Sequence, residues 1–149
     1  MTLALRDARS TDAGGVGAIL SEFIDTTPWM PRIHTRAEEL AFAGDLIERG
    51  WVRLAEASGD VLAFCARDAA EIHALYVHQA LCGQGIGKSL LDDAKARHPN
   101  LALWTFQANT GAQRFYCREG FTETGRTDGA GNDEGLPDIR FEWQAEATT

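Results

Sequence analysis

The spacing of hydrophobic residues predicts strands and helices in alternation along the chain. Apolar residues at alternate positions indicate strands, and recurrences at three and four residues indicate helices. Strands are expected over residues 3–6, 51–56, 61–67, 70–77, 101–106, 121–126 and 139–143. Helices are expected from Ser10 or Thr11 onwards and over residues 35–48, 86–98 and 111–118. This order predicts one α/β domain over residues 1–149 with a mixed sheet.

Turn and capping residues support several of these boundaries. Thr35 followed three residues later by Glu38 is the capping-box pattern that starts a helix. Ser58-Gly59-Asp60 lies between two strand patterns and predicts a hairpin. Pro99 ends the helix that is expected over residues 86–98. The chain is therefore expected to contain a meander followed by a strand–helix–strand unit.

Charge and composition narrow the class of partner. The 149 residues carry a net charge of −8, which argues against nucleic acid or an anionic membrane as the main partner and suits a cationic amine. No apolar run is long enough to span a membrane and no signal-peptide pattern is present, so a cytoplasmic location is expected. The cysteines Cys65, Cys82 and Cys117 form no metal-binding pattern, so no metal is expected.

A run of alternating glycines, Gly83-Gln-Gly-Ile-Gly87, follows one strand and opens the helix after it. Glycine permits backbone conformations that turn successive N–H groups towards a ligand. The first N–H groups of a helix have no internal partner and carry the positive end of the helix dipole. With Lys88, this pattern predicts an anion cradle, although a plain strand–turn–helix connection is an alternative.

Two nucleotide-binding motifs match this loop less well. The Rossmann fingerprint is G-x-G-x-x-G near the start of a βαβ unit, whereas the spacing here is G-x-G-x-G in mid-chain. A P-loop needs a glycine followed, after four residues, by Gly-Lys-Ser or Gly-Lys-Thr. Gly87-Lys88-Ser89 is present, but Cys82 stands at the position of the first glycine. Both motifs are therefore rejected.

A second segment, Asn109-Thr-Gly-Ala-Gln-Arg-Phe-Tyr-Cys-Arg-Glu-Gly-Phe121, decides between the remaining possibilities. With Leu75-Tyr-Val77 and the glycine loop, it resembles the GNAT acetyltransferase superfamily. The pattern of that family is L-x-V at a strand end, a Q/R-x-x-G-x-G/A loop and N-x-x-A-x-x-F/Y-Y-x-x-x-G-F. The resemblance extends over nearly the whole chain in element order. It implies the α/β GNAT fold, with helices on both faces of a mixed, mostly antiparallel sheet of about six to seven strands.

The resemblance also implies a function and a cofactor site. The chain would transfer an acetyl group directly from acetyl-CoA to a primary amine of a small molecule or peptide, and it could form a homodimer. Leu75 to Val77 would pair with the pantetheine arm, the glycine loop would hold the pyrophosphate, and Asn109 would contact the pantetheine. Cys82 replaces the usual Gln or Arg, which is expected to weaken CoA binding at most modestly. The residues expected to bind acetyl-CoA are Leu75, Tyr76, Val77, Gly83, Gln84, Gly85, Ile86, Gly87, Lys88 and Asn109.

Catalysis needs a proton donor for the leaving sulfur and an unprotonated amine. Tyr116, at the motif position, is the expected acid, because a phenol can protonate a thiolate. Glu71 and His73 are candidate bases, since residues two apart share one strand face. Some relatives use a glutamate five residues before the motif asparagine, but Trp104 stands there. Amines that arrive neutral would need no base.

Other interpretations stay open. Tyr116, Glu71 and His73 could be ordinary structural or surface residues, and the chain could be a non-catalytic acyl-CoA-binding or regulatory module. A covalent route through Cys82 or Cys117 is disfavoured, because neither cysteine has a base nearby in the sequence.

Two stretches are candidates for the acceptor pocket. Residues 27–34 could form a wall with Trp29, Met30 and His34. Residues 127–138 contain four acidic residues and no Lys or Arg, so this stretch could attract a cation, although a solvated flexible loop is an equally good interpretation. Its acidic residues are Asp128, Asp133, Glu134 and Asp138.

Overall fold

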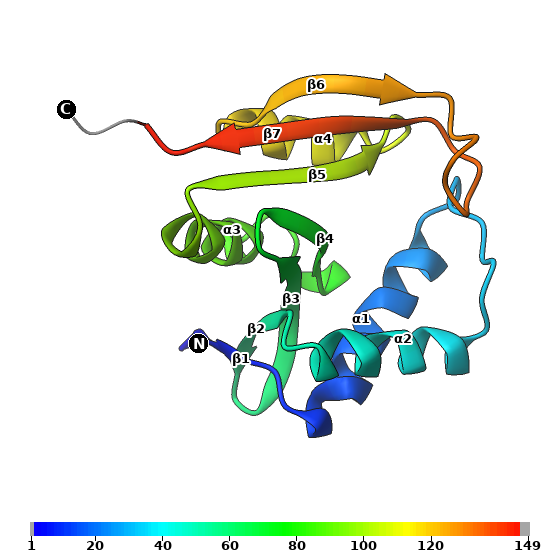
Figure 1. Ribbon diagram of the computed structural model, residues 1–149. Coiled ribbons are helices and arrows are strands. Elements are labelled where there is room, and N and C mark those ends of the chain that lie inside the picture. Colours follow the sequence, from blue (N-terminus) through cyan, green and yellow to red (C-terminus); the bar gives the residue numbers. More distant parts are fainter. Residues whose placement is uncertain (1, 147–149) are drawn as a thin grey trace.

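A computed structural model describes residues 2–146 and contains one seven-stranded sheet in the order β1-β2-β3-β4-β5-β7-β6 (Figure 1). All neighbouring strands are antiparallel except β4 and β5, which are parallel. The strands are β1 Ala4–Asp7, β2 Val52–Ala57, β3 Asp60–Asp68, β4 Glu71–Val77, β5 Asn100–Phe106, β6 Thr122–Thr127 and β7 Asp138–Gln144. The sheet confirms the predicted fold class.

Four α-helices and two short 3-10 turns connect the strands within the described residues. The helices are α1 Ala13–Thr26, α2 Arg36–Glu48, α3 Ile86–Arg97 and α4 Thr110–Arg118, and the 3-10 turns are η1 Ser10–Asp12 and η2 Gln79–Leu81. The predicted capping box is confirmed: the Glu38 N–H donates to the Thr35 hydroxyl (3.1 Å), and the Thr35 N–H donates to the Glu38 carboxylate (2.9 Å). No described helix is both long and apolar enough to cross a membrane.

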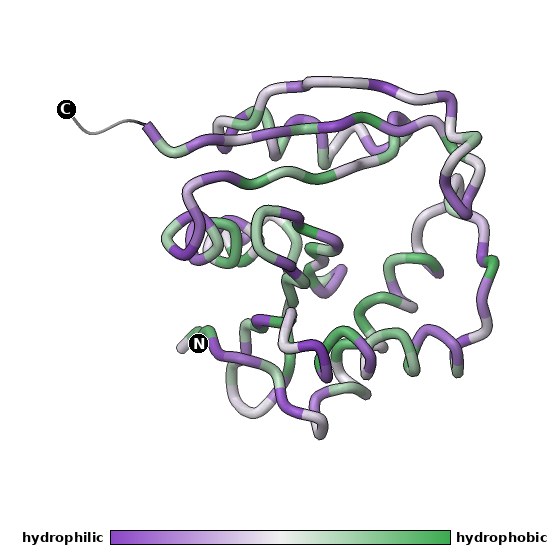
Figure 2. The backbone as a smooth tube through the Cα atoms, viewed as in Figure 1, coloured by the Kyte–Doolittle hydropathy of each residue, from purple (hydrophilic) through white to green (hydrophobic). Residues whose placement is uncertain are grey.

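The helices cover both faces of the sheet and create two hydrophobic cores. On one face, α3 and α4 pack with Leu90, Leu91 and Tyr116 against β4, β5 and β7. On the other face, α1 and α2 pack with residues such as Val16 and Leu46 against β2 and β3. Figure 2 shows the hydrophobic colouring concentrated on α1 and the middle of β5, while β6 at the sheet edge is mostly polar. This distribution is the one that burial of apolar surface favours.

The sheet divides where its two parallel strands separate. β4 and β5 pair only at Glu71–Ala102 and Ile72–Leu103 and then diverge. From Leu75 onwards, β4 pairs with β3 alone, so its other edge has no strand partner. The result is a wedge-shaped gap in the middle of the sheet, and the connections that follow β4 and β5 meet at its open end.

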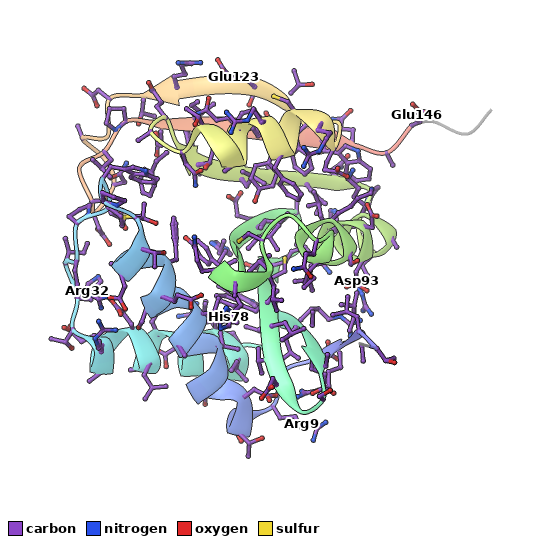
Figure 3. All side chains as sticks on the ribbon, turned by 180° about the vertical axis from the view of Figure 1, so that it is seen from behind. Arg9, Arg32, His78, Asp93, Glu123 and Glu146 are labelled. Atoms are coloured by element: carbon purple, nitrogen blue, oxygen red, sulfur yellow. The ribbon has the colours of Figure 1, made fainter. Side chains whose placement is uncertain are left out.

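The loop between α1 and α2 is held in place by a polar network (Figure 3, where Arg32 is labelled). Glu39 of α2 is buried and accepts from Arg32 (2.6 Å) and from the Ser21 hydroxyl of α1 (2.6 Å). Arg32 also contacts Asp25, which Arg36 contacts at 2.7 Å. The hydrogen bond from Arg36 is the main reason that the pKa of Asp25 lies below its usual value. A buried carboxylate needs such partners, so this network fixes the loop against both helices.

Candidate active site

A cleft of about 1030 Å³ opens where β4 and β5 diverge. Its walls come from the end of α1 and the loop after it, from the second half of β4, from the glycine loop and from α4. The cleft therefore brings together segments that are far apart in the sequence. Of the residues predicted to bind the cofactor, those that line it are Leu75, Tyr76, Val77, Gly83, Gly85, Ile86, Gly87, Lys88 and Asn109; Gln84 is not among them.

The glycine loop presents unpaired backbone donors. Gly83 and Gly85 have φ of 84° and 82°, a left-handed conformation that glycine adopts without steric strain. Gly85 is the N-cap of α3, and its carbonyl accepts from the N–H and the hydroxyl of Ser89. From Gly83 to Lys88, no N–H group donates to any described residue. Such a run at a helix N-terminus is suited to bind phosphate oxygens.

The free edge of β4 supplies further backbone groups. The His78 N–H donates to the Leu62 carbonyl on the β3 side. Because peptide groups alternate in direction along a strand, those of Tyr76 also face β3, whereas those of Leu75 and Val77 face the gap. β5 has already diverged at this point, so these groups have no strand partner. An extended amide-containing ligand could pair with them as a strand would.

Lys88 does not provide the free positive charge that the sequence suggested. Its Nζ lies 3.0 Å from Glu119 and 3.1 Å from Asp92. Hydrogen bonding to Glu119, and then to Asp92, raises the pKa of Lys88. The Glu119 side chain is only 8% exposed, so the ion pair links the start of α3 to the end of α4. The predicted cradle therefore consists mainly of backbone donors.

Two arginines of α4 were missed in the sequence analysis. Arg114 and Arg118 line the cleft four residues apart, on one face of the helix. Arg118 also lies over the Phe115 ring, 5.9 Å from its centroid. The signal that could have found them is their i, i+4 spacing on either side of the motif aromatics. They place positive charge at the cleft in an otherwise acidic chain.

Asn109 lies at the start of α4 and lines the cleft. Its side-chain oxygen accepts from the Ala112 N–H (3.0 Å), so it caps the helix. This use of the oxygen leaves the side-chain NH₂ as the group that could reach a ligand.

Tyr116 lines the cleft from the side of α4 and is only 7% exposed. Its ring packs against Phe115, Phe121 and Phe141, with centroid distances of 5.1, 5.4 and 6.2 Å. Burial raises the pKa of Tyr116 well above its usual value, so the phenol stays protonated. Within residues 2–146, its hydroxyl forms no hydrogen bond with another side chain. A rigid ring with a protonated, uncommitted hydroxyl is a suitable hydrogen-bond donor.

Glu71 and His73 do not border the cleft, which corrects their expected placement. They lie at the start of β4, where β5 is still paired, at the closed end of the gap. Both oxygens of Glu71 accept from Arg140, at 2.7 and 2.8 Å. The His73 ring stacks on Trp51, with centroids 4.9 Å apart. Their role as bases stays a prediction. The contacts with Arg140 and Trp51 give both side chains a structural role as an alternative.

Cys65 and Cys82 show no sign of nucleophilic activation. Cys65 is buried, and burial raises its pKa to about 12. Cys82 lines the cleft, but partial burial, together with the charge of Glu22, raises its pKa as well. A reactive thiolate needs the opposite shift. Across residues 2–146, no group of three or more His, Cys, Asp or Glu could hold a metal ion.

The other side of the cleft is aromatic. Phe23 of α1 packs edge-on against Tyr76 (4.7 Å between centroids) and lies 6.3 Å from Trp29. Trp29 in turn contacts Phe106 at the end of β5 (5.8 Å). Of the three residues expected to form this wall, Trp29 lines the cleft, whereas Met30 and His34 do not.

The loop between β6 and β7 is organised by its own hydrogen bonds. The side chain of Asn132 donates to the Leu136 carbonyl and accepts from the Leu136 N–H. Gly129 has a φ of 88°, and a Cβ atom there would come within 2.3 Å of the Leu136 backbone, so only glycine allows this close approach. In Figure 1 this loop lies beside the loop between α1 and α2. Trp29 of the α1–α2 loop contacts Phe106 at the end of β5, and Phe106 pairs with Asp138 at the start of β7.

Comparisons with known proteins agree with this geometry. Residues 40–123 match the family described as acetyltransferase (GNAT) domain. The chain is 28% identical over 130 residues to the peptidyl-lysine N-acetyltransferase YjaB of Salmonella typhimurium, covering 86% of this chain and 89% of that enzyme. It is 34% identical over 96 residues to the 5-NmdU N-acetyltransferase of Pseudomonas phage PaMx11, covering 59% of this chain and 66% of that enzyme.

Solved structures show the same fold. The apo form of YjaB from Escherichia coli has a TM-score of 0.81 at 20% identity, covering 98% of this chain and all of that one. YncA from Salmonella typhimurium, solved with acetyl-CoA, has a TM-score of 0.73 at 21% identity, covering 100% of this chain and 97% of that one. At these identities, the structural matches establish the fold. The chain belongs to the GNAT family and is an acetyl-CoA-dependent N-acetyltransferase.

Proposed function

We propose that the protein acetylates a primary amine of a small molecule or peptide by direct transfer within the cleft. One observation carries the proposal: the unpaired N–H groups of Gly83 to Lys88, the free edge of β4 and the Tyr116 hydroxyl all belong to one continuous cavity. The first is suited to a pyrophosphate, the second to the amides of pantetheine and the third to a thioester sulfur.

Individual residues have separate roles in holding the cosubstrate. The N–H groups of Gly83 to Lys88 bind the pyrophosphate, and the backbone of Leu75 and Val77 pairs with pantetheine. Asn109 donates from its free NH₂ group. Arg114 and Arg118 neutralise the 3′-phosphate, because a guanidinium group can donate two parallel hydrogen bonds to phosphate oxygens. This assignment lets an acidic protein bind a polyanion through local donors alone.

Tyr116 acts on the leaving group. The amine nitrogen forms a bond to the acetyl carbon while the carbon–sulfur bond breaks, the sulfur takes up the electron pair, and the nitrogen loses a proton. A thiol has a pKa of about 8.5, below that of a tyrosine at about 10, so complete proton transfer from Tyr116 to the thiolate is unfavourable. Because burial raises the pKa of Tyr116, its hydroxyl keeps its proton and can donate a hydrogen bond that stabilises the developing thiolate. The sulfur then gains the proton released by the amine.

The amine must reach the thioester without its proton. A primary ammonium with a pKa of about 10.4 is neutral in about one molecule in a thousand near pH 7.4. The aromatic side of the cleft disfavours a charged nitrogen, since desolvation lowers the pKa of an ammonium group. Because Arg140 and Trp51 already contact Glu71 and His73, we propose that ionisation of the amine itself sets the supply of nucleophile.

The test is thiol release from acetyl-CoA with a panel of amines that includes diamines, amino acids, aminoglycosides and lysine peptides. At least one amine is expected to release free CoA in an amount equal to the acetylated product. Tyr116→Phe serves as the matched control, because the ring and its packing remain. A native protein that binds acetyl-CoA but acetylates no member of the panel, with the same residual thiol release as Tyr116→Phe, would indicate a non-catalytic binding module.

A further inference from the structure

A second hollow adjoins the aromatic side of the cleft. It has a volume of about 460 Å³ and is bounded by the end of β5 and by the loop between β6 and β7. We call it the acceptor hollow, defined by Trp104, Phe106, Asn132 and Glu134. Phe106 contacts Trp29, which lines the cleft, so the two spaces lie on either side of this aromatic pair. An acceptor bound in the cleft could therefore extend into the hollow.

Glu134 differs from the other acidic residues of its loop. Asp138 accepts from the Thr127 hydroxyl and from Asn132, and Asp128 accepts from the Ala130 N–H. Asp133 is exposed and does not line the hollow. Glu134 lines it, and in the described part of the chain its carboxylate forms no hydrogen bond or ion pair. The hollow therefore contains one uncommitted carboxylate.

The surroundings of Glu134 favour a positively charged ligand. Trp104 lines the hollow and is 46% exposed, which is unusual for so large an apolar side chain. An indole ring beside a carboxylate is an arrangement that binds organic cations. Arg140 lies over Trp104, 5.3 Å from the ring centroid, but both oxygens of Glu71 neutralise its charge. Burial is the main reason that the pKa of Tyr76 is raised, and the negative charge of Glu134 raises it further. The charge of Glu134 therefore lies near the cleft wall that Tyr76 forms.

The amine that reacts cannot be the group that Glu134 binds. A carboxylate next to an ammonium raises the pKa of the ammonium and would keep the nucleophile protonated. The reacting nitrogen must instead approach the thioester near Tyr116 and β4. A cation in the acceptor hollow must therefore be a second charged group on the same acceptor.

We propose that the acceptor is a small diamine-type compound whose second, unreacting ammonium binds in the acceptor hollow between Trp104 and Glu134. This inference rests on the proposed function and adds the substrate class. It also assigns Glu134 as a specificity-determining residue with no role in the chemical step. Uniform binding of this kind lowers KM and leaves kcat unchanged.

The test compares 1,5-diaminopentane with pentylamine, which have the same chain length but differ in the second ammonium. Either nitrogen of the diamine can react, so a statistical preference of about 2-fold is expected without any recognition. The native enzyme is expected to prefer the diamine by about 10-fold or more in kcat/KM, since a desolvated cation contact is worth about one decade in affinity. Glu134→Gln should reduce this preference to the statistical value by raising KM for the diamine.

Asp133→Asn is the matched control, because it removes the same charge from the neighbouring position outside the hollow. The control should retain the diamine preference. Equal effects of the two substitutions, or a native preference of about 2-fold, would overturn the inference while leaving acetyl transfer intact.

Calorimetric binding of both amines to the CoA complex gives the same comparison without turnover. Failure of the proposed function therefore stays distinguishable from failure of this inference. If no thiol is released, tighter binding of the diamine that Glu134→Gln abolishes still supports the inference, and equal binding of the two amines overturns it.

Discussion

The two sides of the cleft are built from different parts of the polypeptide. On the proposed cofactor side, the groups that face the cleft are backbone donors from residues 83–88 and the free edge of β4. On the proposed acceptor side, they are side chains from four separate segments: α1, the loop after it, β5 and the loop between β6 and β7. Backbone donors depend on conformation, which glycine and a helix start determine. The acceptor side depends on side-chain identity, so it can change while the cofactor side stays the same.

The largest expected effect comes from placing a side chain in the backbone cradle. Gly87 lies in the first turn of α3, and a Cβ atom there would meet Val77 and Phe115 at ordinary distances of 3.5 and 3.7 Å. Gly87→Ala should therefore fold. Gly87→Glu places a longer, negative side chain at the helix start and should reduce acetyl-CoA affinity by at least about 100-fold, through the loss of two charged hydrogen bonds. Calorimetry on both variants checks this, and unchanged affinity in a folded Gly87→Glu protein would refute the cofactor assignment.

The next largest effect is expected on the rate of catalysis, with acetyl-CoA binding unchanged. Tyr116→Phe keeps the ring packing and should lower kcat by about 10- to 10⁴-fold, while acetyl-CoA affinity barely changes. Because the raised pKa keeps Tyr116 protonated, kcat of the native enzyme should not fall between about pH 8 and pH 10 through ionisation of this residue. Stopped-flow measurement of the chemical step tests both expectations. Native-like turnover of the variant would mean that the thiolate leaves without assistance.

A smaller effect is expected at the mouth of the cleft. Replacing Arg114 and Arg118 with glutamine should abolish discrimination between acetyl-CoA and its 3′-dephospho form, which we expect to be about 10-fold in the native protein. Arg126→Gln is the control, because that arginine pairs with Glu123 on β6, away from the cleft. Discrimination that survives the double substitution would place the 3′-phosphate elsewhere.

The smallest effect is expected at the start of β4. Glu71→Gln and His73→Ala should leave the acidic limb of the pH–kcat/KM profile within about 0.3 pH units of the native one, because amine ionisation sets that limb. The profile is measured with two amines of different pKa. A limb that follows the amine pKa supports the proposal, whereas a limb that shifts or disappears in either variant would identify that residue as the base.

The geometry of the predicted cofactor site follows from local features of the chain, while the assignment of its residues to acetyl-CoA stays a prediction. Successive glycines and the helix start determine where residues 83–88 direct their N–H groups, and both are local features of the chain. The alternating peptide groups of Leu75 and Val77 follow from strand geometry in the same way. Lys88 shows the limit of such reasoning, because its ion pair with Glu119 depends on how α3 packs against α4.

The acceptor side could not be predicted to the same degree. The aromatic contacts there join α1 to β4, through Phe23 and Tyr76, and the loop after α1 to β5, through Trp29 and Phe106. These contacts depend on tertiary packing around the gap between β4 and β5, which no local pattern encodes. The acidic loop was recognised by its composition, but the fold determines that, of its carboxylates without a hydrogen-bond or ion-pair partner among the described residues, Glu134 and not Asp133 lines the hollow. The placement of the candidate bases Glu71 and His73 depends on packing in the same way, since a shared strand face does not show which end of the gap is open.

The contrast between the two sides can be measured directly by following backbone amide and indole signals in a nuclear magnetic resonance titration. Addition of CoA should shift the amide resonances of residues 83–88, together with Leu75 and Val77, and subsequent addition of a diamine should shift the Trp104 indole. The account predicts that the largest CoA-induced shifts lie in the glycine loop and along the free edge of β4. Large CoA-induced shifts confined to the loop between β6 and β7, with residues 83–88 unaffected, would contradict it.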